Sequence, residues 1–115
     1  MGRRTAILIN CSESEARHIR QQAELERRTI SGYILHVALR AVDFDDRLLA
    51  VRPLKKHPTV RPRTTLLLRC SLPEGNRIRM AALRRKGTIS GYLLHCLARH
   101  WEASRNIERV LRTKS

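Results

Sequence analysis

The stretch Thr29-Ile30-Ser31-Gly32-Tyr33 occurs a second time, unchanged, as Thr88-Ile89-Ser90-Gly91-Tyr92. It belongs to a longer repeat, because residues 4–40 and 63–99 align without a gap, and 17 of the 37 aligned residues are identical. A unit of this length cannot bury its own apolar face, so the two copies are expected to complete one shared core. The sequence therefore predicts two similar half-sites within one chain.

The composition points to a polyanionic partner. The 115 residues include 24 lysines and arginines against 10 acidic residues, which gives a formal net charge of +14. Residues 63–115 carry most of the excess, whereas residues 41–50 are acidic. So large an excess of positive charge makes the folded chain repel itself, and it therefore favours a polyanionic partner. Nucleic acid is the first candidate, and an anionic membrane surface is the second.

Several function classes find no support in the residues. No apolar run approaches the length of a transmembrane helix, and the N-terminus has no signal-peptide pattern. The three cysteines have no metal-ligand spacing. No nucleophile with a base, carboxylate pair or glycine-rich phosphate loop is evident. We expect a reduced, cytoplasmic protein that is not an enzyme and that needs no cofactor or metal.

Each copy begins with a short segment rich in strand-forming residues, 5–11 and 64–70. Alternation divides each segment into two rows. In the first copy Ile7, Ile9 and Cys11 form a wholly apolar row, which is expected to face the core, and the second copy has a matching row. The opposite rows then face solvent or a ligand. They consist of Ala6, Leu8, Asn10, Thr65, Leu67 and Arg69.

The two predicted strands are expected to pair with each other. A single strand leaves its main-chain N–H and C=O groups unpaired, and the only other candidate strand is the second copy. Pseudo-symmetry predicts an antiparallel ribbon. With Leu8 opposite Leu67, Cys11 and Cys70 would lie on the order of 20 Å apart. A disulfide tolerates only about 7 Å between Cα atoms, so these two thiols are expected to stay free. The predicted cross-strand pairs are Leu8 with Leu67, Ala6 with Arg69, and Asn10 with Thr65.

Two helices are predicted after each strand. Ser12 and Glu15 have the spacing of a capping box at the start of the first helix. In the second copy, Pro73 suits the first turn and Gly87 is a good helix stop. The threonine of the repeated stretch is expected to cap the second helix in each copy. The tyrosine of the same stretch is expected to pack with its hydroxyl exposed.

The chain divides into three predicted parts. Residues 1–42 form the first repeat, residues 43–62 a helix extension and a basic, proline-containing linker, and residues 63–115 the second repeat with a C-terminal helix. The expected fold class is mainly α with a short two-stranded antiparallel β-ribbon. The four helices are expected to form a pseudo-two-fold core beneath the ribbon.

This order of parts resembles the ribbon-helix-helix family of DNA-binding proteins, which includes Arc and MetJ. The resemblance covers both repeats. It rests on the order of elements, on Cys11-Ser12-Glu13-Ser14-Glu15 at the end of the strand, and on the repeated start of the second helix. Members of the family usually form homodimers of one-unit chains, so this chain resembles a fused pseudo-dimer. The resemblance implies that the ribbon enters the major groove and that the start of the second helix holds a phosphate.

All six outward side chains are predicted to contact bases. Arg69 has the planar fork that suits guanine O6 and N7, Asn10 can pair with adenine N6 and N7, and Thr65 can bond to several bases. Ala6, Leu8 and Leu67 offer only apolar contact, for example with a thymine methyl. This departs from the commonly polar outward positions of the family and predicts a reduced readout of sequence.

The start of the second helix in each copy is predicted to bind a phosphate. Exposed N–H groups and the helix dipole attract an anion there, and a glycine allows close approach. Ordinary capping is the alternative, but the repetition of the whole run beside basic residues favours a phosphate. The predicted phosphate contacts are Arg3, Arg4, Arg27, Arg28, Thr29, Ser31, Gly32, Arg63, Arg84, Lys86, Thr88, Ser90 and Gly91.

The sequence thus predicts a double-stranded DNA-binding protein, most simply a transcriptional repressor, with further copies of the chain as candidate partners on DNA. One alternative is an antitoxin-like protein that neutralises a toxin partner and represses its own promoter. The short segment after the second repeat weighs against it. Another alternative is a basic protein that binds nucleic acid regardless of sequence. No membrane partner is expected.

Overall fold

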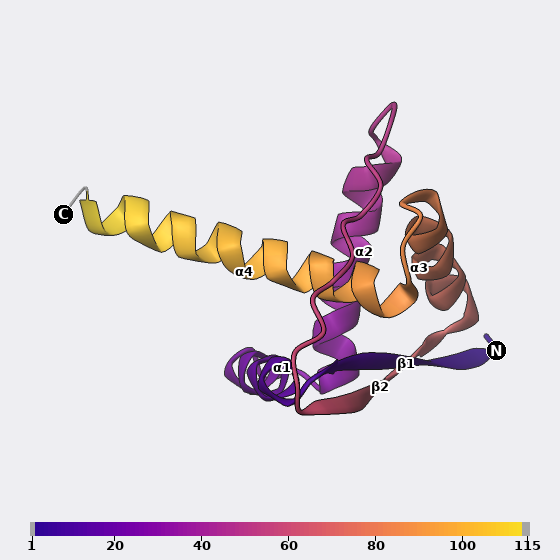
Figure 1. The fold of residues 1–115 in the computed structure, drawn as a ribbon, viewed down its shortest axis with the longest axis horizontal. Helices are drawn as coiled ribbons and strands as arrows, with labels where there is room; N and C mark the ends of the chain where they lie inside the picture. Colours follow the sequence, from indigo (N-terminus) through magenta and orange to yellow (C-terminus); the bar gives the residue numbers. More distant parts are fainter. Residues whose placement is uncertain (1, 114–115) are drawn as a thin grey trace.

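The computed structural model describes residues 2–113, which are mainly helical with a two-stranded antiparallel sheet. This is the fold class that the sequence predicts. No helix in this range is both long enough and apolar enough to span a bilayer. The elements in chain order are β1 (Arg4–Ser12), α1 (Glu13–Leu25), α2 (Ile30–Asp46), β2 (Arg63–Ser71), α3 (Leu72–Arg84) and α4 (Ile89–Thr113) (Figure 1).

The two strands pair antiparallel within the one chain, in the predicted register. The pairs Leu8–Leu67, Ala6–Arg69 and Asn10–Thr65 are all present. Cys11 and Cys70 lie near opposite ends of the ribbon and are free thiols. The wholly apolar rows of both strands face inward together, which excludes every register that is shifted by one residue.

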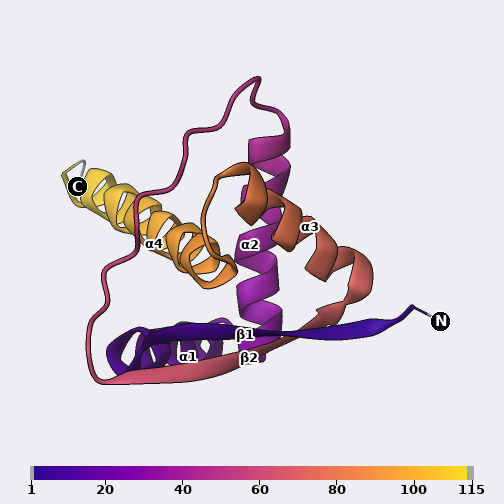
Figure 2. The same cartoon turned by 45° about the vertical axis from the view of Figure 1, so that its right-hand side comes forward.

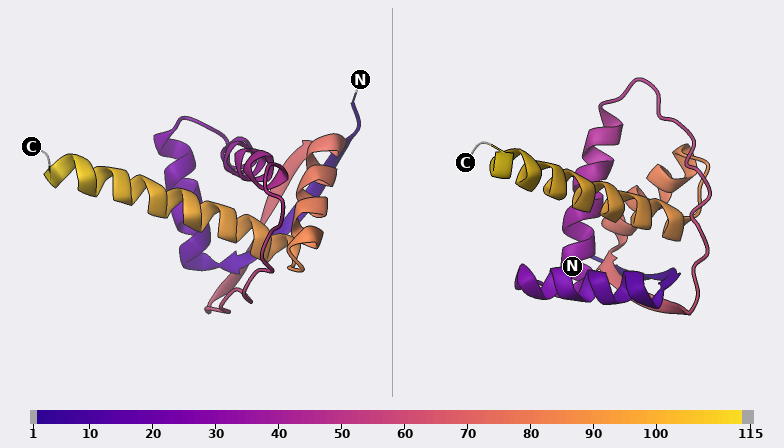
Figure 3. Two further views of the ribbon diagram at one scale, coloured as in Figure 1. Left: turned by 90° about the horizontal axis from the view of Figure 1, so that it is seen from above. Right: turned by 60° about the vertical axis from the view of Figure 1, so that its left-hand side comes forward.

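The core lies between the inner face of the ribbon and the helices. The inner-row residues Ile7, Ile9, Leu66 and Leu68 are at most 5% exposed. Figure 2 shows the ribbon along the lower edge of the molecule, with α2, α3 and α4 above it. The second half of α4 projects beyond the rest of the fold (Figure 3), and every residue from 102 to 113 is exposed.

Capping boxes start both α1 and α3. Ser12 accepts a hydrogen bond from the Glu15 N–H at 3.1 Å, and the Ser12 N–H donates to the Glu15 carboxylate at 2.8 Å. This confirms the predicted cap. Ser71 and Glu74 form the same box at α3, where Pro73 occupies the first turn. Each box satisfies two main-chain N–H groups at the start of its helix.

The predicted role of Gly87 as a helix stop is wrong. Helix α3 ends at Arg84, and the residue with the left-handed backbone is Lys86, with φ 53°, as Arg27 is in the first copy, with φ 54°. A Cβ atom at Gly87 would lie 2.9 Å from Leu54 Cδ1. The glycine therefore makes room for the linker and does not end the helix.

The expectation of exposed tyrosine hydroxyls is also wrong. Tyr33 and Tyr92 are both fully buried. The Tyr33 hydroxyl accepts a hydrogen bond from Trp101 Nε1 at 2.7 Å, and the Tyr92 hydroxyl donates to Asp45 at 3.3 Å. Each hydroxyl thus meets a residue of the other repeat's second helix, a partner that no local pattern indicates.

The acidic end of α2 is bound by arginines of α3 and by Arg85, which directly follows it. Asp45 accepts two hydrogen bonds from Arg85, at 2.8 and 3.0 Å, and the two side chains are only 9% and 12% exposed. The acidic composition of residues 41–50 therefore has a structural cause. Exposed ion pairs around this buried one join Asp43 and Asp46 to Arg77 and Arg84.

The linker lies against the fold. Residues 48–62 have no helix or strand and run from the end of α2 back to the ribbon. The Leu54 N–H donates to the Arg85 carbonyl at 2.8 Å. His57 Nε2 lies 2.7 Å from a carboxylate oxygen of Glu15. These contacts hold the linker beside the start of α4.

Candidate nucleic-acid interface

The structure places all six predicted outward side chains on the exposed face of the ribbon. The centre of this face is apolar, since Leu8 is 63% exposed and Leu67 is 41% exposed. The polar side chains lie to either side, with Arg69 at one end and Asn10 and Thr65 at the other. The two ends of the outer face therefore present different hydrogen-bonding groups.

The start of α2 and the start of α4 are each bonded to one edge of the ribbon. The Ser31 hydroxyl accepts a hydrogen bond from the Arg69 N–H at 2.9 Å, and the Ser90 hydroxyl accepts one from the Asn10 N–H at 2.9 Å. Each hydroxyl also lies within 3.5 Å of a strand carbonyl. Sequence reasoning assigned these hydroxyls to phosphate, whereas the structure uses them to satisfy the open edges of the strands.

The helix starts retain unpaired main-chain donors. At α2 the Gly32 N–H donates to the Thr29 hydroxyl at 3.0 Å, and the Tyr33 N–H donates to the Thr29 carbonyl at 2.9 Å. The N–H groups of Ile30 and Ser31 have no partner within residues 2–113. Thr88 caps α4 with the same two bonds. Two free N–H groups at a helix start suit an anion.

The glycines of the repeated stretch are explained by the caps alone. A Cβ atom at Gly32 would lie 3.0 Å from the Thr29 hydroxyl, and one at Gly91 would lie 2.9 Å from the Thr88 hydroxyl. Contacts this close would push the capping hydroxyl away. A larger residue at either position would therefore weaken the cap whether or not a phosphate approaches.

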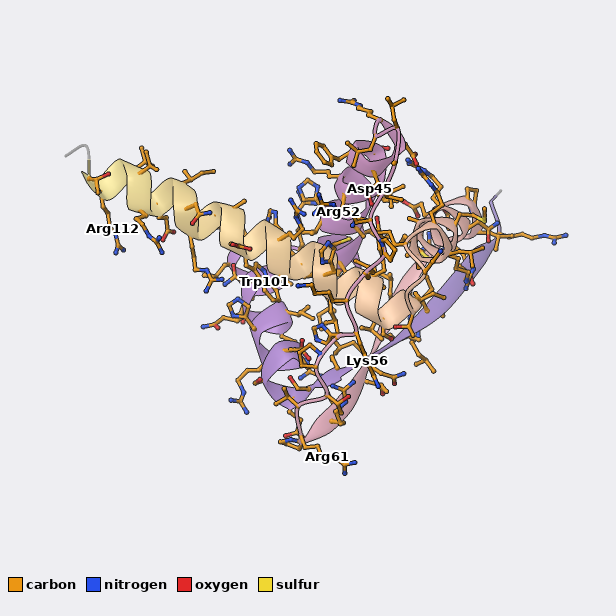
Figure 4. All side chains as sticks on the ribbon, turned by 45° about the horizontal axis from the view of Figure 1, so that its top comes forward. Asp45, Arg52, Lys56, Arg61, Trp101 and Arg112 are labelled. Carbon is orange, nitrogen blue, oxygen red and sulfur yellow. The ribbon has the colours of Figure 1, made fainter. Side chains whose placement is uncertain are left out.

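A basic cavity adjoins the start of α4. It has a volume of about 710 Å³ and extends from Asn10 on the ribbon to the linker. Figure 4 shows the basic side chains Arg52, Lys56 and Arg61 spaced along the linker. Lys55 and Lys56 were not among the predicted contacts, although the paired lysines between two prolines were a usable signal. The cavity is lined by the cationic side chains Lys55, Lys56, Arg63 and Lys86.

Glu15 couples the linker to the capping box. Burial alone would raise the pKa of this carboxyl, but hydrogen bonds from the Ser12 N–H and from His57 lower the pKa below its ordinary value. The carboxylate therefore remains ionised while it binds both partners. His57 is the linker residue nearest to Gly91, with its Cβ 4.0 Å from the place of a Gly91 Cβ atom.

The other arginines that are predicted to contact phosphate differ in whether a carboxylate already binds them. Arg84 donates to Asp46 at 3.1 Å, so its guanidinium is engaged by the acidic end of α2. Arg28 lies 3.7 Å from Glu26, in an exposed pair. The prediction for Arg84 overlooked this partner because Asp46 is far away in sequence. Three further predicted phosphate contacts, Arg3, Arg4 and Arg27, are exposed and have no carboxylate partner within residues 2–113.

Comparisons with known proteins do not suggest a function, so the proposal below rests on the sequence and the geometry. No protein-family model, curated protein or solved structure matches this chain. Within residues 2–113 no group of three or more histidine, cysteine or acidic side chains could hold a metal ion.

Proposed function

We propose that this chain binds double-stranded DNA as a tandem ribbon-helix-helix protein and acts as a transcriptional repressor. One observation carries the proposal: an exposed row of six side chains is flanked on both edges by helix starts, each bonded to the strand beside it. A surface whose only task was solubility would have no need to hold two anion-binding helix starts at fixed positions beside one ribbon.

The dimensions and charges of duplex DNA fit this arrangement. The major groove is about 12 Å wide and admits a two-stranded ribbon. A ribbon inserted in the groove brings the helix starts on its two edges toward the phosphates on the two sides of the groove. The net charge of +14 supplies the attraction that any sequence of DNA would feel.

Sequence preference would come from the polar ends of the outer face. Arg69 can donate two hydrogen bonds to guanine, and Asn10 can both donate to and accept from adenine. Leu8 and Leu67, at the centre, can contact only the methyl group of thymine. A repressor of this kind acts by occupying its operator.

Binding without regard to sequence is the second candidate function. It is favoured by one specific observation, namely that three of the six outward side chains, Ala6, Leu8 and Leu67, cannot hydrogen-bond to a base. In that case the phosphate contacts at the helix starts and along the linker would supply nearly all of the affinity.

Selection from a pool of random duplexes tests both candidates. A repressor should enrich a defined element, and fluorescence anisotropy should show that this element binds tighter than a scrambled duplex of equal length at the same salt concentration. Equal affinity for both duplexes would reject the repressor and support the second candidate. Failure to bind either duplex at low salt would reject both.

A further inference from the structure

A cavity separate from the outer face lies between α2 and α4. Its volume is about 380 Å³. The two helices contribute equivalent residues to it, because all but one of the positions that line it from α2 recur in α4 at the 59-residue offset of the repeat. Three such pairs are Val37 with Cys96, Arg40 with Arg99, and Phe44 with Ala103.

The cavity has a surplus of positive charge. Arg40 and Arg99 are both exposed, and neither has a carboxylate partner within residues 2–113. Among residues 2–113, Asp45 is the only acidic side chain that lines the cavity, and Arg85 already occupies both of its oxygens. Two arginines in equivalent positions therefore face a common space without a counterion.

One wall contains an unsatisfied polar group. His95 lines the cavity, and its Nε2 atom is buried without a hydrogen-bond partner within residues 2–113. Burial lowers the pKa of this imidazole, and the nearby Arg85 and Arg99 lower it further, so the ring is neutral at pH 7. Buried polar atoms almost always have partners, and this nitrogen is available to hydrogen-bond to a molecule in the cavity.

Most of the remaining lining is apolar, apart from the imidazole of His100 and the hydroxyl of Tyr92. Val37 and Cys96 are at most 4% exposed and form part of the cavity, while Phe44 remains 61% exposed at its margin. Phe44 is therefore not part of the hydrophobic core. The volume falls in the range of about 300–1,000 Å³ that is typical of small-molecule sites.

We propose that this cavity binds a small organic anion with an apolar body. The anionic group lies between Arg40 and Arg99, where the guanidinium donors lack partners. The apolar body packs against Val37, Cys96 and Phe44. This site is distinct from the outer face of the ribbon, and the proposal does not depend on DNA binding.

The test uses 8-anilinonaphthalene-1-sulfonate, a fluorescent anion with an apolar body, and needs no DNA. We expect saturable binding of one probe per chain, with enhanced fluorescence. The R40Q/R99Q double variant should weaken binding by roughly tenfold or more, because it removes both charge-assisted hydrogen bonds. Glutamine is a good helix former, so these exposed helical positions should tolerate the change.

Matched controls separate this site from general attraction to a basic protein. The R105Q/R109Q variant removes the same charge from the projecting half of α4, and its affinity should stay within about twofold because exposed distant charges are screened. The uncharged analogue N-phenyl-1-naphthylamine should bind much more weakly than the sulfonate. Inorganic phosphate, which lacks an apolar body, should not displace the probe.

The apolar part of the site has its own variant. Ala103→Leu should fill the margin of the cavity and reduce probe binding. Near-UV circular dichroism should stay unchanged, which excludes loosely packed states that also bind the probe. The proposal is overturned if R40Q/R99Q binds as the parent does, or if R105Q/R109Q loses as much affinity. Equal binding of the uncharged analogue, or displacement by phosphate, would also overturn it.

Discussion

The Ser90 hydroxyl accepts a hydrogen bond of 2.9 Å from the main-chain N–H of Asn10, which lies 80 positions earlier in the chain. Ser31 makes the equivalent bond, also of 2.9 Å, with the N–H of Arg69. Asn10 and Arg69 are the two outward side chains best suited to read a base. The contact that positions each helix start therefore also fixes the main chain of a proposed reading residue.

Replacement of Ser90 by alanine should destabilise the fold by about 1 kcal/mol, since it removes one partner of a strand-edge hydrogen bond. Urea unfolding measures the loss. Hydrogen exchange of the Asn10 amide should become faster at the same time. Ser104→Ala is the matched control, because the Ser104 hydroxyl bonds only to the His100 carbonyl of its own helix. Unchanged exchange at Asn10 in the Ser90 variant would contradict the role of this bond.

Replacement of Arg69 by alanine should leave the melting temperature unchanged, because the side chain is exposed on the outer face. Affinity for the preferred duplex should fall by about 1–3 kcal/mol, and the base preference at that position should relax. Anisotropy titrations at fixed salt measure both effects. Arg109→Ala, on the projecting end of α4, should retain the preference. An Arg69 variant that binds every duplex as the parent does would exclude this residue from base readout.

A single bound chain should prefer an asymmetric element. A homodimer presents identical rows to a palindrome, whereas here Ala6 pairs with Arg69 at one end of the ribbon and Asn10 with Thr65 at the other. Guanine is expected on the Arg69 side. The logarithm of affinity should fall with the logarithm of salt concentration, with a slope of about −0.9 per phosphate neutralised. A perfectly palindromic core in the selected sites would indicate readout through DNA shape instead.

Replacement of Asp45 by asparagine should destabilise the protein by about 3–5 kcal/mol, because it leaves the nearly buried Arg85 without a countercharge. Asp43→Asn provides the comparison, since its ion pair with Arg77 is exposed and should contribute about 0–1 kcal/mol. Urea midpoints of the two variants give the difference. Similar losses in both would mean that burial of the Asp45 pair has no energetic consequence.

Acid should destabilise the protein through its two capping glutamates. Burial opposes ionisation of Glu15, but hydrogen bonds from Ser12 and His57 outweigh it and lower its pKa, and hydrogen bonds from Ser71 lower the pKa of Glu74. A carboxyl with a lowered folded-state pKa stabilises the fold above its ordinary pKa of 4.5, and this is lost as the pH falls through the folded-state value.

Urea unfolding between pH 6 and pH 3 tests this dependence. The E15Q/E74Q variant keeps an acceptor at each cap but cannot titrate, so its stability should change less across this range than that of the parent. Parallel curves for the two proteins would show that the capping glutamates do not cause the acid sensitivity.

Much of the fold follows from the sequence because the signals are local or repeated. Strand alternation has a period of two, so facing both apolar rows to the core excludes all registers shifted by one residue, and the observed pairing of Leu8 with Leu67 is one of those that remain. The capping box of Ser12 and Glu15 spans one helical turn, so its partners are close in any context. The exposed outer row follows directly from the same alternation.

The tertiary structure alone decided the contacts between distant elements. The Ser90 hydroxyl binds a strand, Tyr33 meets Trp101 across 68 positions, and Arg84 meets Asp46 across 38. The cavity between α2 and α4 likewise depends on how these helices pack. Such partners are set by the distances and angles at which whole elements dock. No period in the sequence encodes those angles, so residue type and spacing showed which groups were available but not which of them would meet.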